Sequence, residues 1–339
     1  MIFLRAVPPE LVQGVASGIY TITGSVVRDV ASGRGVGFLQ ETGVLQTLLG
    51  NVMTSGANPL GAFVNLGLGA ASVIQNQQIK ARLAELQSSL AILQNLQLGT
   101  LAVSGLGLGV SVAGFAAMLK RLKGIEDHLG TIDAKIDNVT SERRSDDVRM
   151  IFADIRTQLD VIDTLSARSY NVSSAEAAER ALAKSAGRLQ AHFQQKSEFM
   201  QIGAIVSADM DFLWSLAAAI RVCHEAGLRA LFTIEELEAA KKLAERHAQR
   251  FLDLSQPLTP DVLARLSSQN VEDAIAYARA RRLALPQAEV LVLGLRNSVA
   301  SIGSQSELAQ SLITNQISGA DYLKEIEGEK DEPLIMLPA

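Results

Sequence analysis

The feature that most constrains this chain is a stretch of 78 residues, between Glu41 and Lys120, that is almost free of charge. Its three charged residues are Lys80, Arg82 and Glu85, whereas the other 261 residues hold 64 of the 67 charged side chains. A solvated helical surface carries charges along its whole length. The stretch therefore has to be covered by protein or by lipid.

Two segments of this stretch, 57–75 and 98–119, are apolar. The second has 22 residues, enough to cross a hydrocarbon core of about 30 Å. Twelve of them are Gly, Ala, Ser or Thr, so a lone helix would gain little from insertion. Small residues four apart let helices approach closely in lipid. The predicted helix-packing residues are Gly105, Gly109, Ala113 and Ala117, together with Gly67 and Gly69 of the first segment.

Both segments are also explained as interior helices of a soluble bundle, because a helix that is apolar all round is often simply buried. The glycine content speaks against that explanation, since each Gly in a water-surrounded helix costs about 0.8–1.0 kcal/mol relative to Ala. Lys120, Arg121 and Lys123 follow the second segment, as positive residues follow a span on its cytoplasmic side. We expect the second segment to form a helix that is stable in two environments: inside a protein bundle, and in lipid when it packs against its own copies.

Beyond the apolar stretch, apolar residues recur at alternating steps of four and three, which is typical of a coiled-coil seam. A second apolar stripe follows a charged patch, "SERRSDD". Together they predict one long helix over roughly 116–168, with a partner helix along the seam from this chain or from another copy. The seam residues are Ile125, Leu129, Ile132, Ile136 and Val139, and the stripe residues are Ile151, Ile155, Leu159, Ile162 and Leu165.

A small β module is predicted at the N-terminus. Its Val, Ile, Thr and Tyr residues favour a hairpin over Gly18–Glu41, with "ASGRG" as the turn and a short helix over 8–17 before it. An isolated hairpin is marginal in water. The chain ends, "MIFLRAV" and "PLIMLPA", are apolar and bounded by Pro, which favours extended backbone. We predict that one or both ends pair with the hairpin as a sheet; the alternative is a disordered tail.

The C-terminal half predicts further helices and then a non-helical tail, "EIEGEKDEPLIMLPA". The segments "EAGLRALFT" and "ALPQ" are among those that separate the helices. One helix begins near Ser173, and the others cover 203–226, 233–254, 260–283 and 286–316. The predicted fold class is mainly α: a long-helix bundle with an apolar helical hairpin and a small N-terminal β-hairpin module. The predicted regions are 1–50 (β-hairpin module), 51–120 (apolar Gly-rich helical hairpin), 121–170 (long coiled-coil-like helix), 171–316 (helical bundle) and 317–339 (tail).

No motif points to catalysis, to a cofactor or to a metal. Two glycine runs, "SGRGVG" and "GLGLG", lack the Lys-Ser/Thr that a phosphate loop requires. "CHE" at 223–225 is interpreted as a buried Cys223 with a surface His224 and Glu225, because adjacent helical residues diverge by about 100°. The remaining histidines lack zinc spacing. We predict that the chain is not an enzyme.

Charge and composition limit the kinds of partner that the chain is expected to bind. The net charge is −5 and no long basic stripe exists, so nucleic acid is not an expected partner. The glutamates of 233–254 (Glu235, Glu236, Glu238 and Glu245) are interpreted as a solvated face. The apolar run of "MIFLRAVPPE" is too short for a secretory leader, so we expect a cytoplasmic location after synthesis, or exit by a route without a leader, and membrane association in the active form. The expected partners are a lipid membrane and other copies of the chain.

The organisation of 42–168 resembles, in plan rather than in motif, the α-helical pore-forming toxins of the cytolysin A and haemolysin BL type. The resemblance implies a long-helix bundle whose apolar hairpin is tucked away in the soluble form and inserts after a change of shape. The function predicted is membrane perturbation by an oligomer, as a toxin or a cell-suicide or defence effector. The alternatives are a soluble coiled-coil scaffold or adaptor, and a constitutive two-span membrane protein with cytosolic domains.

Overall fold

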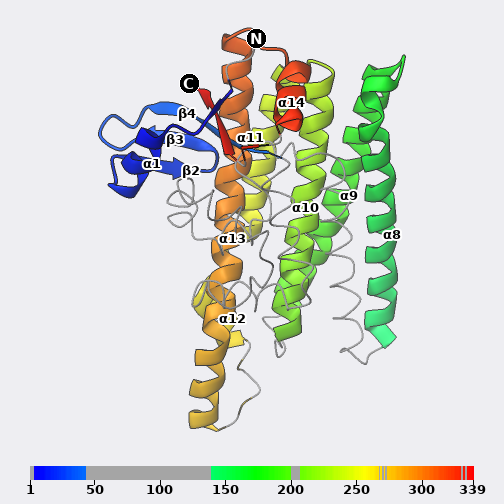
Figure 1. Cartoon of the computed structure of the whole chain (residues 1–339). Helices are drawn as coiled ribbons and strands as arrows, with labels where there is room; N and C mark the ends of the chain where they lie inside the picture. The colour runs from blue at the N-terminus through cyan, green and yellow to red at the C-terminus, as the bar shows by residue number, and fades with distance from the viewer. Residues whose placement is uncertain are drawn as a thin grey trace.

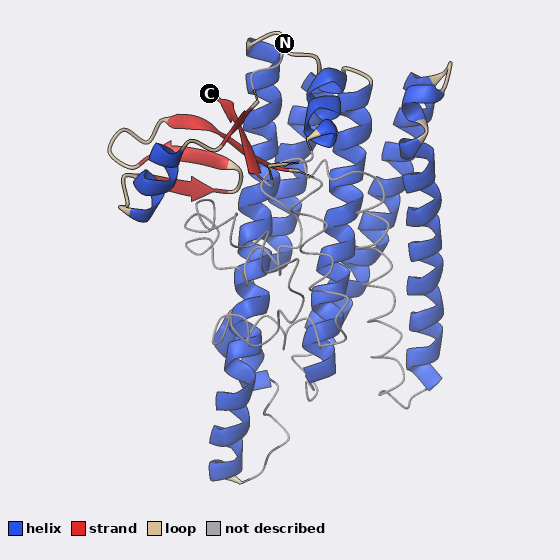
Figure 2. Ribbon diagram, viewed as in Figure 1, coloured by secondary structure: helices blue, strands red, loops and turns tan. Residues whose placement is uncertain are grey.

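The chain was analysed as a computed structural model that describes residues 4–42, 139–199 and 207–339, apart from 267, 269, 270, 272, 330 and 333. Within these ranges the chain is mainly helical with one small antiparallel sheet, so the predicted mainly-α class is confirmed. The sheet lies against the side of the helical bundle near one of its ends, and both chain termini lie at that end (Figures 1 and 2). The apolar hairpin predicted over 51–120 lies outside the described residues.

The bundle is built from long helices that lie side by side. Helix α9 packs along both α8 and α10, α11 packs along α13, and α10 contacts α11 and α13 as well, which joins the two groups. The short α12 packs on α13. The bounds are α8 Val139–Asp163, a 3₁₀ turn Leu165–Ala167, α9 Asn171–Phe199, α10 Ser207–Thr233, α11 Leu237–Ser255, α12 Pro260–Leu266, α13 Ala274–Thr314 and α14 Gly319–Gly328.

The apolar stripe predicted after the charged patch forms the inner face of α8 and continues into the 3₁₀ turn that follows it. All five of its residues, from Ile151 to Leu165, are buried, as expected for apolar positions that recur on one helical face. The long helix predicted over 116–168 is thus described from Val139 onward, and it ends at Asp163 before the 3₁₀ turn. The predicted seam residues before Val139 lie outside the described residues.

Three helix boundaries predicted from the sequence are wrong. The separator "EAGLRALFT" continues α10. The helix predicted over 260–283 is two helices, and α13 continues without a break through Pro286. Proline cannot donate to the carbonyl of Arg282, but this turn is exposed and water can reach it. The opposite side of the same turn, with Ala284 and Ala288, packs in the core and holds the helix together.

The sheet has five strands in the order β1-β5-β4-β3-β2. The predicted two-stranded hairpin is wrong in one respect: it has three strands, because a tight turn at Gly24, with φ of +62°, separates β2 from β3. The predicted turn "ASGRG" connects β3 to β4, and the short helix predicted over 8–17 is α1. The bounds are β1 Arg5–Ala6, α1 Pro9–Ala16, β2 Tyr20–Thr23, β3 Val26–Asp29, β4 Gly35–Glu41 and β5 Leu334–Pro338.

Both chain ends join this sheet, as predicted. Strand β5 lies between β1 and β4 and pairs antiparallel with each, with Met336 opposite Arg5 on one side and Leu39 on the other. The residues of β5 from Leu334 to Leu337 are all buried. The prediction of a non-helical tail is wrong for its first part, because α14 continues to Gly328. Ser318 caps α14 by accepting a hydrogen bond from the amide of Asp321.

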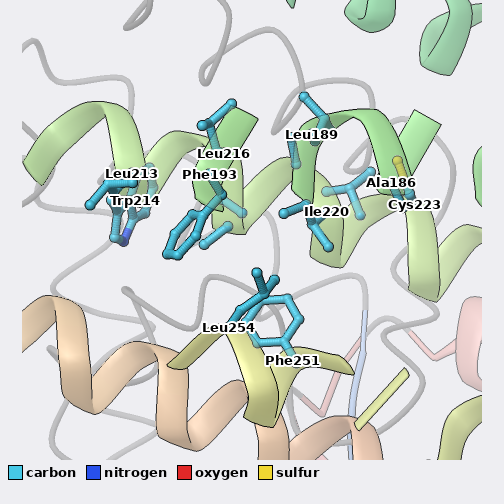
Figure 3. Packing of buried hydrophobic residues seen from close by; sticks show 14 of the residues in the cluster. Ala186, Leu189, Phe193, Leu213, Trp214, Leu216, Ile220, Cys223, Phe251 and Leu254 are labelled. Atoms are coloured by element: carbon cyan, nitrogen blue, oxygen red, sulfur yellow. The ribbon is translucent and has the colours of Figure 1, made fainter. Parts of the chain in front are cut away.

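Two large apolar cores form among the described residues. The helical core joins α8, α9, α10, α11, α12 and the middle of α13. The sheet-end core joins the inner face of the sheet to the end of α10, the start of α11, the end of α13 and α14. Helix α1 covers the other face of the sheet. Figure 3 shows the centre of the helical core, where side chains from α9, α10 and α11 meet: Leu189, Phe193, Leu216, Ile220, Phe251 and Leu254.

Candidate functional site

A layer of buried polar side chains lies where the two apolar cores meet. On α10, α11 and α13 its members stand between residues of the helical core and residues of the sheet-end core. All of them are buried. We call this set the polar layer: Ser25 beside β3, Arg221, His224 and Glu225 on α10, His247 on α11, and Ser298, Ser301, Ser304 and Gln305 on α13.

The centre of the polar layer is an ion pair with no solvent exposure. Arg221 donates from Nε to Oε1 of Glu225 at 2.9 Å, and its Nη2 lies 2.8 Å from the same oxygen. The guanidinium also donates to the carbonyl oxygen of Ser298 at 3.1 Å and to Oγ of Ser301 at 2.6 Å. A buried charge is tolerated only when it is paired and hydrogen-bonded. These contacts therefore tie α10 to α13.

A second set of hydrogen bonds connects the polar layer to the sheet. Ser25 donates from its amide and from Oγ to Oγ of Ser304, at 3.0 and 2.8 Å, and Ser304 donates to the carbonyl of Ser301 at 2.8 Å. The preceding residue, Gly24, approaches α13 so closely that a Cβ would lie 2.4 Å from the carbonyl oxygen of Ala300. The β2–β3 turn is thus seated directly on α13.

Two stacked imidazoles form the other side of the polar layer. The rings of His224 and His247 lie 3.7 Å apart between centroids and 14° from parallel, and Phe251 meets His224 edge-on at 6.3 Å. Among the described residues, neither ring nitrogen of His224 has a hydrogen-bond partner. The interpretation of His224 and Glu225 as surface residues is therefore wrong; that of Cys223 as buried is confirmed.

Burial disfavours the charged form of both imidazoles. It holds the pKa of His224 well below the ordinary value, and the charges of His247 and Arg221 add to this effect. Burial likewise lowers the pKa of His247 to about 3, with further lowering by Arg250 and Arg246. Both rings are thus neutral in the folded protein at neutral pH. Protonation of either one places an unpaired charge in the interior.

The C-terminal strand holds the residues at which the charge-poor stretch begins. Glu41, the last residue of β4, pairs with Leu334, and Oγ1 of Thr42 donates to the carbonyl of Glu332 at 2.6 Å. Thr42 is the first residue of the charge-poor stretch. We call Glu332 together with β5 the C-terminal latch. It holds the N-terminal end of the charge-poor stretch against the sheet.

The helix-packing residues predicted from the sequence (Gly67, Gly69, Gly105, Gly109, Ala113 and Ala117) lie outside the described residues, as do Ile125, Leu129, Ile132 and Ile136 of the seam. Val139 is the first residue of α8. Glu235, Glu236, Glu238 and Glu245 are exposed, as predicted, and Glu235 also caps α14 by accepting from the amides of Gly319 and Ala320.

The described part of the chain contains neither a group of metal ligands nor a bilayer span. In it, no three His, Cys, Asp or Glu residues are grouped so as to hold a metal ion. No helix of the same ranges combines the length and the hydropathy that a bilayer span requires. Burial raises the pKa of the Cys223 thiol, so this cysteine is an inert core residue. That the chain is not an enzyme stays a prediction.

The sequence contained one usable signal for the polar layer. Arg221, His224 and Glu225 are spaced i, i+3 and i+4 and therefore share a helical face, within the mostly apolar segment 212–228 of α10. Adjacent residues of a helix diverge, so the shared face is visible only at these wider spacings. Comparisons of the chain with protein families, with curated proteins and with solved structures found no match.

Proposed function

We propose that the protein perturbs membranes: it oligomerises and inserts the apolar Gly-rich hairpin of 51–120. The observation that carries the proposal is the stretch of 78 residues with three charges, which follows directly on β4. In this proposal the protein is a toxin or a cell-suicide or defence effector. It is cytoplasmic as synthesised and membrane-associated when active.

Two features of the scaffold support a change of shape. The first is the C-terminal latch, a terminal segment that holds the start of the charge-poor stretch through strand pairing and the Thr42–Glu332 hydrogen bond. The second is the polar layer, which interrupts the apolar packing between the two cores. Because the latch holds the residues at which the charge-poor stretch begins, its release is the proposed trigger. The likeness in plan to toxins of the cytolysin A and haemolysin BL type agrees with this sequence of events.

The decisive experiment measures dye release from vesicles by the purified full-length chain, with and without removal of the latch. Gly109→Leu provides the sharpest variant, because a large side chain in the row of small residues blocks close approach of helices in lipid. We expect Gly109→Leu to abolish leakage while circular dichroism and melting stay as in the wild type. Leakage at the wild-type rate would remove the row of small residues from the mechanism.

The alternative of a soluble scaffold is favoured by one observation: α8, α9 and α10 lie side by side over much of their length. A scaffold would neither float with vesicles nor release dye under any condition, including latch removal. A constitutive two-span membrane protein would require detergent for extraction from the start. Vesicle flotation and detergent dependence therefore separate the three functions.

A further inference from the structure

The N-terminal end of α13 carries an exposed face that the proposed function does not use. Figure 1 shows this end projecting beyond the bundle at the end far from the sheet. Ile275 and Leu283 are 81% and 70% exposed, and Arg279 and Arg282 are exposed beside them. With 100° between successive residues, these four side chains fall within a third of the helix circumference. We call them the α13 tip face.

The opposite side of the same segment is occupied. Ala284 and Leu285 pack against the helical core and Ala288 is buried in it, while Arg281 forms an ion pair with Asp261 of α12. The core contacts of this segment are therefore made by the side of α13 opposite the tip face. The tip face is not needed for packing within the chain.

The chemistry of the tip face points to one kind of partner. Single exposed apolar residues are ordinary on a protein surface, but here two of them flank two arginines on one short helical segment. The chain as a whole is acidic, so this basic face is not a general property of the surface. We propose that the α13 tip face binds the surface of a membrane that contains anionic lipid, with Arg279 and Arg282 on phosphate and carboxylate headgroups and Ile275 and Leu283 in the interface.

Two neighbouring acidic residues mark the limits of the tip face. Glu289 is exposed about two turns beyond Arg282 and ends its basic character, and Asp273 caps the helix through the amide of Ala276. A second copy of the chain fits less well than a lipid surface. Twofold docking on this face would bring the arginines of both copies together, and like charges repel.

The test is flotation of the full-length chain with phosphatidylcholine vesicles and with vesicles that also contain phosphatidylserine. We expect binding to the second kind only, weakened by added salt. Arg279→Gln with Arg282→Gln should weaken the partition by roughly 5-fold for each arginine, about 25-fold together. Ile275→Ser with Leu283→Ser should weaken it as well.

Two matched controls keep the result specific. Lys184→Gln with Lys242→Gln removes the same charge from exposed sites on α9 and α11, and Met150→Ser removes an exposed apolar side chain from α8. Both controls should float as the wild type does. Equal loss in the controls, or no flotation of the wild type, overturns the inference. A change of mass by light scattering without lipid would assign the face to contacts between copies and overturn it as well.

This inference is tested independently of membrane perturbation, because docking and leakage are measured in different assays. Lipid binding that depends on the tip face, without dye release, would retain the inference and overturn the proposed function. Dye release and flotation that are unchanged in the tip-face variants would do the reverse.

Discussion

The two apolar cores of this protein are assembled in different ways. The helical core draws mainly on α8 to α12, which follow one another in the chain. The sheet-end core joins Phe38, near the N-terminus, to Leu308 and Ile335, near the C-terminus. One core is therefore made mostly between successive helices, whereas the other depends on contacts between segments that are far apart in the sequence. Proteins open locally where the contacts are most easily lost, so the sheet end is the part expected to open first.

The largest expected effect comes from removing the C-terminal latch. Truncation after Asp331 deletes four buried apolar side chains, Leu334 to Leu337. At about 1.5–3 kcal/mol each, their burial contributes roughly 6–12 kcal/mol as an upper bound. We expect β3, β4 and α14 to lose hydrogen-exchange protection while α8, α9 and α10 retain it, and vesicle leakage to begin without another trigger.

Removal of Ala339 alone is the control for this truncation. It deletes one exposed residue, whose amide donates to the carbonyl of Val36, and should change stability far less than the long truncation does. If the long truncation melts and protects its amides as the full chain does, the two cores do not differ in the way described. The latch would then have no role in holding the sheet.

A matched pair of substitutions compares the two cores directly. Phe193 in the helical core and Phe38 in the sheet-end core are both buried, and a Phe→Ala change in a core costs about 3–5 kcal/mol. Phe193→Ala should lower the melting temperature of the whole bundle. Phe38→Ala should mainly raise amide exchange in the sheet, since the sheet end opens locally. Identical exchange patterns in the two variants would mean that the chain unfolds as one unit.

The difference between the cores also explains what could be predicted from the sequence. The buried stripe from Ile151 to Leu165, along α8 and the 3₁₀ turn after it, was predictable because helical periodicity is local. The sheet formed by both chain ends was predictable because apolar extended termini satisfy the edges of a marginal hairpin. The passage of α13 through Pro286 was not, since packing of Ala288 and Leu291 overrides the local preference.

The polar layer was missed for a similar reason. Arg221 meets Ser298 and Ser301 across about 80 positions of sequence, and His224 stacks on a residue of another helix. Spacing on one helix indicates which residues share a face but not what that face meets. The buried state of His224 and Glu225 therefore required the tertiary structure.

The seat of the sheet on α13 is tested by a third comparison, of two glycines at positive φ. Gly24 has φ of +62° and lies against the backbone of Ala300, whereas Gly33 has φ of +69° in open space. The left-handed backbone costs an alanine about 1–2 kcal/mol at either position. At Gly24 the clash with α13 adds about 1–3 kcal/mol.

Thermal melting should therefore show Gly24→Ala destabilised by about 2–5 kcal/mol, and Gly33→Ala by the smaller backbone cost alone. Equal melting temperatures for the two variants would show that the turn is free to move away from α13. In that case the contact between the sheet and the bundle is carried elsewhere.

The smallest expected effect concerns the boundary between the cores, where His247 lies. Its pKa is lowered from 6.5 to about 3 in the folded protein, so the unfolded chain binds more protons in between. Stability is therefore complete above pH 6.5 and falls as the pH drops toward 3. The loss for His247 alone is about 2 kcal/mol at pH 5, and His224 adds to it in the same direction.

Melting temperatures at pH 7 and pH 5 measure this loss, and His247→Phe isolates it. Phenylalanine retains a ring that can stack on His224 but does not titrate. At pH 7 both imidazoles are neutral when folded, so any difference from the wild type there reports packing alone. Between pH 7 and pH 5 the variant should lose about 2 kcal/mol less than the wild type. An equal loss would mean that water reaches His247 as readily as in the unfolded chain, and that the polar layer is not closed between the two cores.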